Sequence, residues 1–103
     1  MNRWLYGLVA SALMSIALAS ESSAPGDSLR YLLTHDCGSC HGMQLKGGLG
    51  PPLTREALKG YPVDYVAQVI LDGRTGTAMP PWRALLTSDD ARWLAEQLIK
   101  GME

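Results

Sequence analysis

Both cysteines of the chain lie in one short motif, Cys37-Gly38-Ser39-Cys40-His41. This C-x-x-C-H spacing is typical of covalent c-type haem attachment. Two sulfurs one helical turn apart can form thioethers with the two vinyl groups on one edge of a porphyrin, and the next residue then directs its imidazole at the iron. The motif therefore predicts one covalent haem c, attached through Cys37 and Cys40, with His41 as an axial ligand of the iron.

A C-x-x-C pair has other known uses, as a local disulfide, a thioredoxin-like redox pair or part of a zinc site. Thioredoxin-like chemistry needs a βαβ frame, which the sequence does not predict. A zinc site would draw on His35, Cys37, Cys40 and His41, which are crowded into seven residues and suit tetrahedral geometry poorly. Haem attachment is the stronger interpretation.

A methionine is the candidate for the second axial ligand. Met43 is too close to His41 to reach the opposite face of the ring, and Met102 lies at the C-terminus. Met79 lies far downstream in a loop stiffened by the two prolines that follow it, with enough chain to pass round a porphyrin. The alternatives are that Met79 fills the core, or that His35 ligates instead, although His35 lies on the attachment edge.

The N-terminus is typical of an export signal. An uncharged apolar run follows Arg3 and ends in a small-x-small cleavage pattern at Ala19. We expect residues 1–19 to be a cleaved signal peptide, 20–26 a flexible segment and 27–103 the haem domain in the periplasm. A membrane location would follow only if the signal stayed uncleaved.

Length, cysteine count and charge balance exclude several classes of protein. The chain has 103 residues, which suits one small domain, and two cysteines, which exclude a scaffold of several disulfides. Its 9 basic and 10 acidic side chains show no excess of positive charge. A nucleic-acid partner is therefore not expected.

Helical periodicity dominates the part that follows the signal, and no segment alternates as a strand would, so the predicted fold class is all-α. Two blocks rich in glycine and proline, 42–52 and 73–81, form loops between the helices. Thr87 and Asp90 have the spacing of a capping box. The expected helices run from Asp27 to Asp36, from Thr54 to Leu58, from Pro62 to Gly73, and from Thr87 to near Gly101.

From residue 27 to residue 100, the order of these features resembles the class I monohaem cytochromes c. The resemblance implies a cytochrome c fold of about four helices wrapped round one haem, with the first and last helices crossing. It also implies His41 and Met79 as axial ligands. The Pro51 carbonyl would then accept a hydrogen bond from the second ring nitrogen of His41.

The Gly47–Thr54 loop and the stretch from Ile70 to Arg83 are most similar to the small NirC-type cytochromes, also called cytochrome c55X. These accompany the cytochrome cd nitrite reductase of denitrifying bacteria. The resemblance implies redox protein partners: nitrite reductase, the apparatus that matures its haem, and an upstream quinol-oxidising donor.

The chain departs from many relatives in its first helix. Where those carry a glycine and an aromatic residue that meet the last helix, this sequence has Leu29 and Leu33. We expect Trp93 or Leu94 to rebuild that contact.

Four further side chains are candidates for haem contacts. Trp82 could pack beside the haem or donate its indole N–H to a propionate, or it could simply belong to the core. Arg55, Arg74 and Arg83 are candidate propionate partners, the alternative for each being a solvated surface position.

An iron whose two axial positions are filled by protein leaves no place for a substrate. We therefore expect a one-electron carrier and not an enzyme, and His/Met ligation raises the potential relative to bis-His ligation. The alternatives are a haem enzyme or gas-binding protein with an open distal site, and a haem subunit or assembly factor of a larger complex.

Overall fold

The computed structural model describes residues 25–102, and in that range the chain consists of helices and loops without strands. The all-α prediction is confirmed. The predicted signal peptide and most of the 20–26 segment lie outside the described residues. Within the described part, no helix is both long and apolar enough to cross a bilayer.

The first helical segment is longer than the sequence indicated. Three elements follow one another without a break: α1 (Pro25–Leu32), the π-helix η1 (Leu33–Cys37) and α2 (Gly38–His41). The Gly38 N–H donates to the Leu33 carbonyl five residues back, which is the π-helical pattern. Helix therefore extends past the predicted end at Asp36 and carries the whole C-x-x-C-H motif.

Residues 54–58 form one hydrogen-bonded turn in place of the expected helix. The Leu58 N–H donates to the Thr54 carbonyl at 3.0 Å, and the Ala57 N–H donates to Thr54 Oγ1 at 3.2 Å. Thr54 thus caps the turn as predicted, but Gly60, at φ 90°, and Pro62 follow too closely for a helix to grow.

The last two helices match their sequence signals. Helix α3 (Val63–Asp72) begins after Pro62 and ends at Gly73. Helix α4 (Ser88–Lys100) starts with the predicted capping box, because the Thr87 hydroxyl accepts from the Asp90 N–H and the Asp90 carboxylate accepts from the Thr87 N–H. Its buried residues recur at helical spacing: Ala91, Leu94, Ala95 and Leu98.

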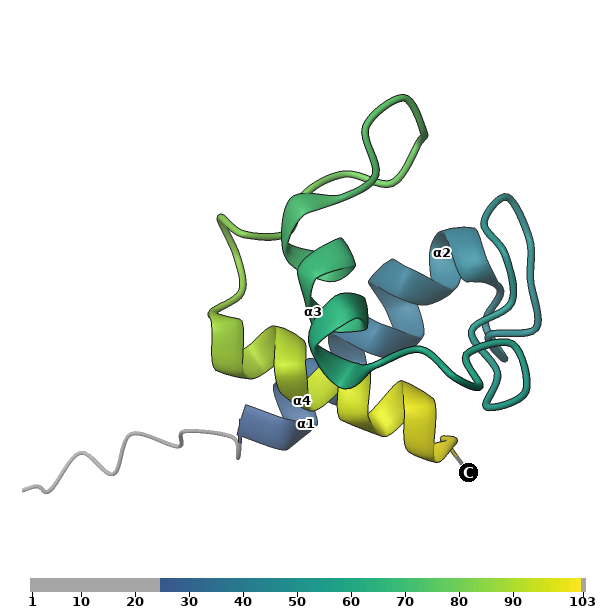
Figure 1. Ribbon diagram of the computed structural model, residues 1–103, viewed down its shortest axis with the longest axis horizontal. Helices are drawn as coiled ribbons and strands as arrows, with labels where there is room; N and C mark the ends of the chain where they lie inside the picture. Colours follow the sequence, from purple (N-terminus) through teal and green to yellow (C-terminus); the bar gives the residue numbers. More distant parts are fainter. Residues whose placement is uncertain (1–24, 103) are drawn as a thin grey trace, which may run out of the picture.

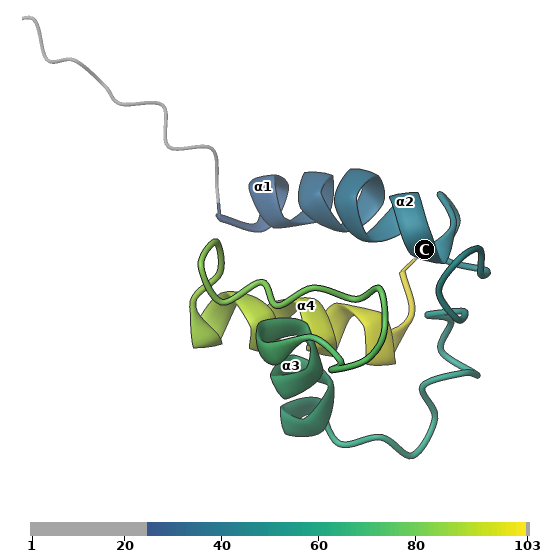
Figure 2. The ribbon, with the colours of Figure 1, turned by 90° about the horizontal axis from the view of Figure 1, so that it is seen from above.

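Helix α4 lies between the α1–α2 segment and α3 (Figure 2). Figure 1 shows α1 crossing α4, as the resemblance implied. A β-carbon on Gly26 would lie 3.5 Å from Trp93 Cζ2, and the Arg30 guanidinium lies 5.4 Å from the centre of the same ring.

Leu29 and Leu33 belong to the same buried cluster as Leu94. Trp93 therefore lies against the first helix at Gly26 and Arg30, and Leu94 shares the core with the two leucines of that helix.

Candidate haem-binding site

The two cysteines lie one helical turn apart at the end of the first helical segment. Cys37 is the last residue of η1 and Cys40 lies in α2, and neither forms a disulfide. Burial, with a smaller contribution from the Asp36 charge, raises the pKa of the Cys37 thiol to about 11. The structure thus presents two unpaired sulfurs on one helical turn, with the Cys37 thiol neutral.

The next residue, His41, is 9% exposed and its ring is held from one side. Its Nδ1 lies 2.7 Å from the Pro51 carbonyl oxygen. A carbonyl can only accept, so Nδ1 carries a proton, and in the neutral ring the lone pair is then on Nε2. The contact implied by the resemblance is present, and it leaves Nε2 as the nitrogen able to bind a metal.

The loop after α2 folds back onto the end of that helix. The Gly47 N–H donates to the His41 carbonyl and the Gly50 N–H donates to the Cys40 carbonyl, each at 2.8 Å. These bonds satisfy carbonyls that the end of the helix leaves without intrahelical partners. They also place Pro51 next to the His41 ring.

Gly50 has a role that sequence reasoning missed. A β-carbon there would lie 2.7 Å from His41 Cε1 and 2.8 Å from His41 Nδ1. Only glycine lets the backbone pass so close to the imidazole. The glycine-rich run before Pro51 was the available signal, but composition alone does not indicate which glycine touches the ring.

Met79 lies on a separate loop, residues 73–82, which in Figure 1 stands on the same side of α4 as α2. Its side chain is half-buried and packs against the core. The Met79 carbonyl accepts from the Arg74 N–H at 3.2 Å. Gly73, at φ 66°, lies directly beneath, since a β-carbon there would come within 2.7 Å of the Met79 oxygen.

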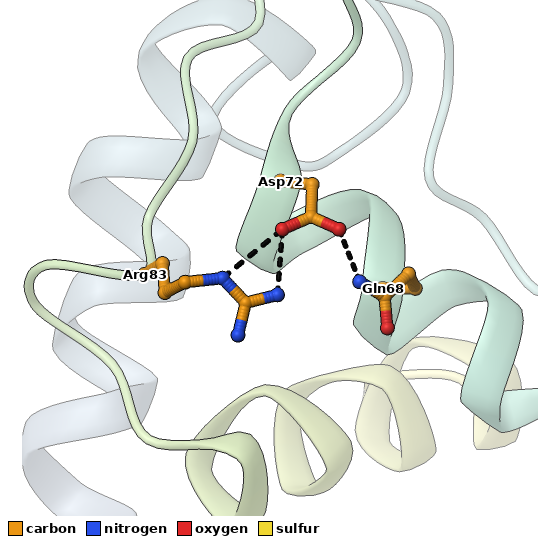
Figure 3. A network of polar contacts seen from close by, with 3 residues as sticks. All are labelled: Gln68, Asp72 and Arg83. Atoms are coloured by element: carbon orange, nitrogen blue, oxygen red, sulfur yellow. Dashed lines mark hydrogen bonds and ion pairs between the residues drawn. The ribbon is translucent and has the colours of Figure 1, made fainter.

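The remaining candidates lie in different surroundings. Trp82 is half-buried against the core, and Arg83 forms an ion pair with Asp72 (Figure 3). Arg74 is exposed in the Met79 loop. Arg55 lies near the end of α4, where a β-carbon on Gly101 would be 3.5 Å from its Cδ.

These residues fit a haem c. The donor set comprises an imidazole whose Nε2 has no described hydrogen-bond partner, a thioether, and two unpaired thiols spaced for attachment. A planar apolar group also needs apolar walls, and candidates for them are partly buried side chains that pack against the core: Leu45, Leu53, Leu58, Val63, Met79 and Trp82. The fold and this donor set together define a c-type cytochrome domain.

Comparison with known proteins agrees with that class. A family model described as cytochrome C oxidase, cbb3-type, subunit III matches residues 24–97. Cytochrome c55X of Paracoccus denitrificans (strain Pd 1222) is 52% identical over 95 residues, which cover 86% of this chain and 92% of that protein. The chain therefore belongs to this family of cytochrome c domains and, within it, to the cytochrome c55X group.

Two solved structures are similar to the chain. The c-type cytochrome NirC has 55% sequence identity and a TM-score of 0.71, over 73% of this chain and 88% of that one. Dihydro-heme d1 dehydrogenase NirN, solved in complex with DHE, has 33% identity and a TM-score of 0.65. The match covers 77% of this chain but 16% of NirN, so it concerns one part of that larger protein.

Proposed function

We propose that the chain is a periplasmic one-electron carrier in which Cys37 and Cys40 hold one haem c covalently and His41 and Met79 are its axial ligands. When bound, the haem supplies the ferric/ferrous couple, which His/Met ligation tunes toward the reduced state. The observation that carries the proposal is the 2.7 Å contact between His41 Nδ1 and the Pro51 carbonyl, on the helix that bears both cysteines.

Each residue has a distinct task in this proposal. The Pro51 carbonyl accepts from His41 Nδ1 and so orients the ring, which leaves Nε2 as the nitrogen that faces the iron. Proline suits the acceptor position because its backbone is stiff and has no N–H to compete. The 73–82 loop, seated on Gly73, carries the Met79 thioether.

Ligation from both sides supports a carrier over an enzyme or a gas-binding protein, because a ligand supplied by the chain occupies the place that a substrate or gas would need. The similarity to cytochrome c55X, to NirC and to part of NirN supports a place in denitrification. We infer two candidate roles there: electron donation to cytochrome cd nitrite reductase, or a step in the maturation of its haem. The rate of electron transfer from the reduced carrier, measured side by side with purified nitrite reductase and with a purified enzyme that matures its haem, distinguishes the two roles.

Replacing Met79 with alanine tests the proposed ligation. We expect Met79→Ala to keep its covalent haem and to lose the weak far-red absorption band that reports a methionine–iron bond in the oxidised protein. The variant should also bind CO when reduced, whereas the parent protein should not. Met43→Ala, which removes an exposed methionine near the attachment helix, is the matched control and should behave as wild type. An unchanged spectrum and potential in Met79→Ala would exclude it as a ligand.

Salt dependence tests how the carrier meets its partner. The side chains expected around the exposed haem edge are mainly apolar, namely Met43, Leu45, Ala78, Pro80 and Pro81. Among nearby charges, Arg83 is already paired with Asp72. Steering needs a field of one sign. We therefore expect the rate of electron transfer to change less than about tenfold while salt shortens the Debye length from ~30 to ~8 Å.

Stopped-flow oxidation of the reduced carrier by its partner measures this dependence. A fall of more than tenfold in the rate of electron transfer would show that charge steering dominates the encounter. It would contradict docking through the mainly apolar side chains around the haem edge.

A further inference from the structure

The loop that carries Met79 begins and ends on the same turn of α3. The chain leaves that helix at Asp72 and returns at Trp82, whose N–H donates to the Ile70 and Leu71 carbonyls, both at 3.1 Å. The Arg83 N–H also donates to the Leu71 carbonyl at 3.1 Å. Both ends of the loop are therefore fixed next to each other, and the position of Met79 depends on how firmly they stay together.

One carboxylate joins the two ends through side chains (Figure 3). Asp72 Oδ1 accepts from Arg83 Nε at 3.1 Å and from Arg83 Nη2 at 2.6 Å. Asp72 Oδ2 accepts from the Gln68 side-chain amide, one helical turn earlier. Arg83 and Gln68 hold the pKa of Asp72 below its ordinary value, so the carboxylate is ionised at neutral pH.

The position of Asp72 is unfavourable for the stability of α3 but allows an ion pair with the far end of the loop. A negative charge in the last turn faces the negative end of the helix dipole and is unfavourable for α3 by itself. The two-pronged contact from Arg83, which comes from the far end of the loop, offsets that cost.

Between its two fixed ends, the loop has few other described hydrogen bonds. Its described internal hydrogen bonds link Arg74, Thr77 and Met79, and residues 74–78 are exposed. The two prolines after Met79 have no N–H to donate. The backbone of Met79, Pro80 and Pro81 instead lies against Gly73, the residue that follows Asp72.

From this arrangement we infer that Asp72 is a positioning residue for Met79: by tying the Arg83 side chain to the end of α3, it reinforces the backbone hydrogen bonds that close the 73–82 loop and so keeps the methionine in its ligating position. The inference rests on the proposed axial role of Met79. Asp72 and Arg83 act through the loop and do not themselves touch the iron.

The chain offers a matched control. Asp64 in the first turn of α3 forms an ion pair with Arg92 of α4, which is also exposed and also joins α3 to a later segment. That pair lies away from the Met79 loop. Asp72→Asn and Asp64→Asn therefore remove the same charge from the same helix, and only the first removes a contact between the two ends of the loop.

Amide hydrogen exchange of the holoprotein directly tests the ion pair between Asp72 and Arg83, called the brace below. In Asp72→Asn and in Arg83→Gln, we expect the Arg74 and Thr77 amides to exchange about three- to fivefold faster, the scale of a well-formed exposed ion pair. The double variant should be no faster than either single one, since both remove one interaction. Asp64→Asn should leave these amides unchanged. Equal exchange in Asp72→Asn and wild type would overturn the inference.

Imidazole, which competes with a methionine for oxidised haem iron, tests the consequence for Met79. Its apparent affinity should rise by the same factor in Asp72→Asn and not in Asp64→Asn. Faster amide exchange without tighter imidazole binding would show that the brace does not position Met79. Failure of the proposed ligation gives a different result: Met79→Ala would then bind imidazole no better than wild type, and amide exchange alone would decide whether Asp72 closes the loop.

Discussion

A chain with Cys37→Ser and Cys40→Ser together is expected to give no folded protein after export. The core of the described residues is thin, and the large side chains that are almost fully buried are Leu33 and Leu94. Domains of this size have thin cores and often gain stability from a disulfide, metal or cofactor. If a covalent haem supplies that surface, removing both attachment points removes the centre of the fold.

The measurement is the yield of soluble protein, followed by circular dichroism during heating. Ser39→Ala is the control, because it lies inside the motif, keeps both cysteines and loses only two exposed contacts of the Ser39 hydroxyl, with the Asp36 carbonyl at 2.7 Å and with Cys40 Sγ at 3.9 Å. It should fold and carry haem. A double serine variant that melts cooperatively without haem would show that the polypeptide builds a sufficient core by itself.

Local signals predicted the C-terminal half of the fold well. The start of α4 is a capping box, and its buried face follows from helical periodicity, so both were visible in a short stretch of sequence. The attachment motif was visible for the same reason: its chemistry depends on spacing within five consecutive residues.

Helix boundaries set by tertiary contacts were not predictable in this way. Gly38 and Ser39 are weak helix formers, yet the helix runs through them to His41. The opposite happened at residues 54–58, where an apparent helix is reduced to one turn. Leu58 is half-buried there and the chain turns away at Gly60 before a second turn can form.

Residues whose role depends on contacts with distant parts of the sequence were the hardest to predict. Gly73 and Asp72 look like an ordinary helix end until the Met79 loop returns over them. Arg83 was a candidate for a haem propionate, and its partner in the structure is a carboxylate on α3. Such pairings join segments whose proximity is set by the fold, and no local pattern encodes them.

Gly50 is the sharpest example, and changing it should have a large effect on the site. In Gly50→Ala, the new methyl group would lie 2.7 Å from His41 Cε1, closer than real β-carbons approach other atoms. Either the imidazole or the loop must move, and both movements pull Nδ1 away from the Pro51 carbonyl. Crowding and the lost hydrogen bond together should lower the free energy of unfolding by about 2–4 kcal/mol.

Gly26→Ala is the matched control for this change. Gly26 lies in the first turn of α1, and its new β-carbon would make an ordinary 3.5 Å contact with Trp93. The free energy of unfolding should therefore change little. Thermal unfolding of the two holoproteins measures the difference in stability, and the reduction potential reports the proximal side, because a histidine that loses its carbonyl partner becomes a weaker donor to iron. We expect Gly50→Ala to melt well below wild type, with a shifted potential. Wild-type melting and potential in Gly50→Ala would mean that the close approach of Gly50 to His41 does not hold the proximal ligand.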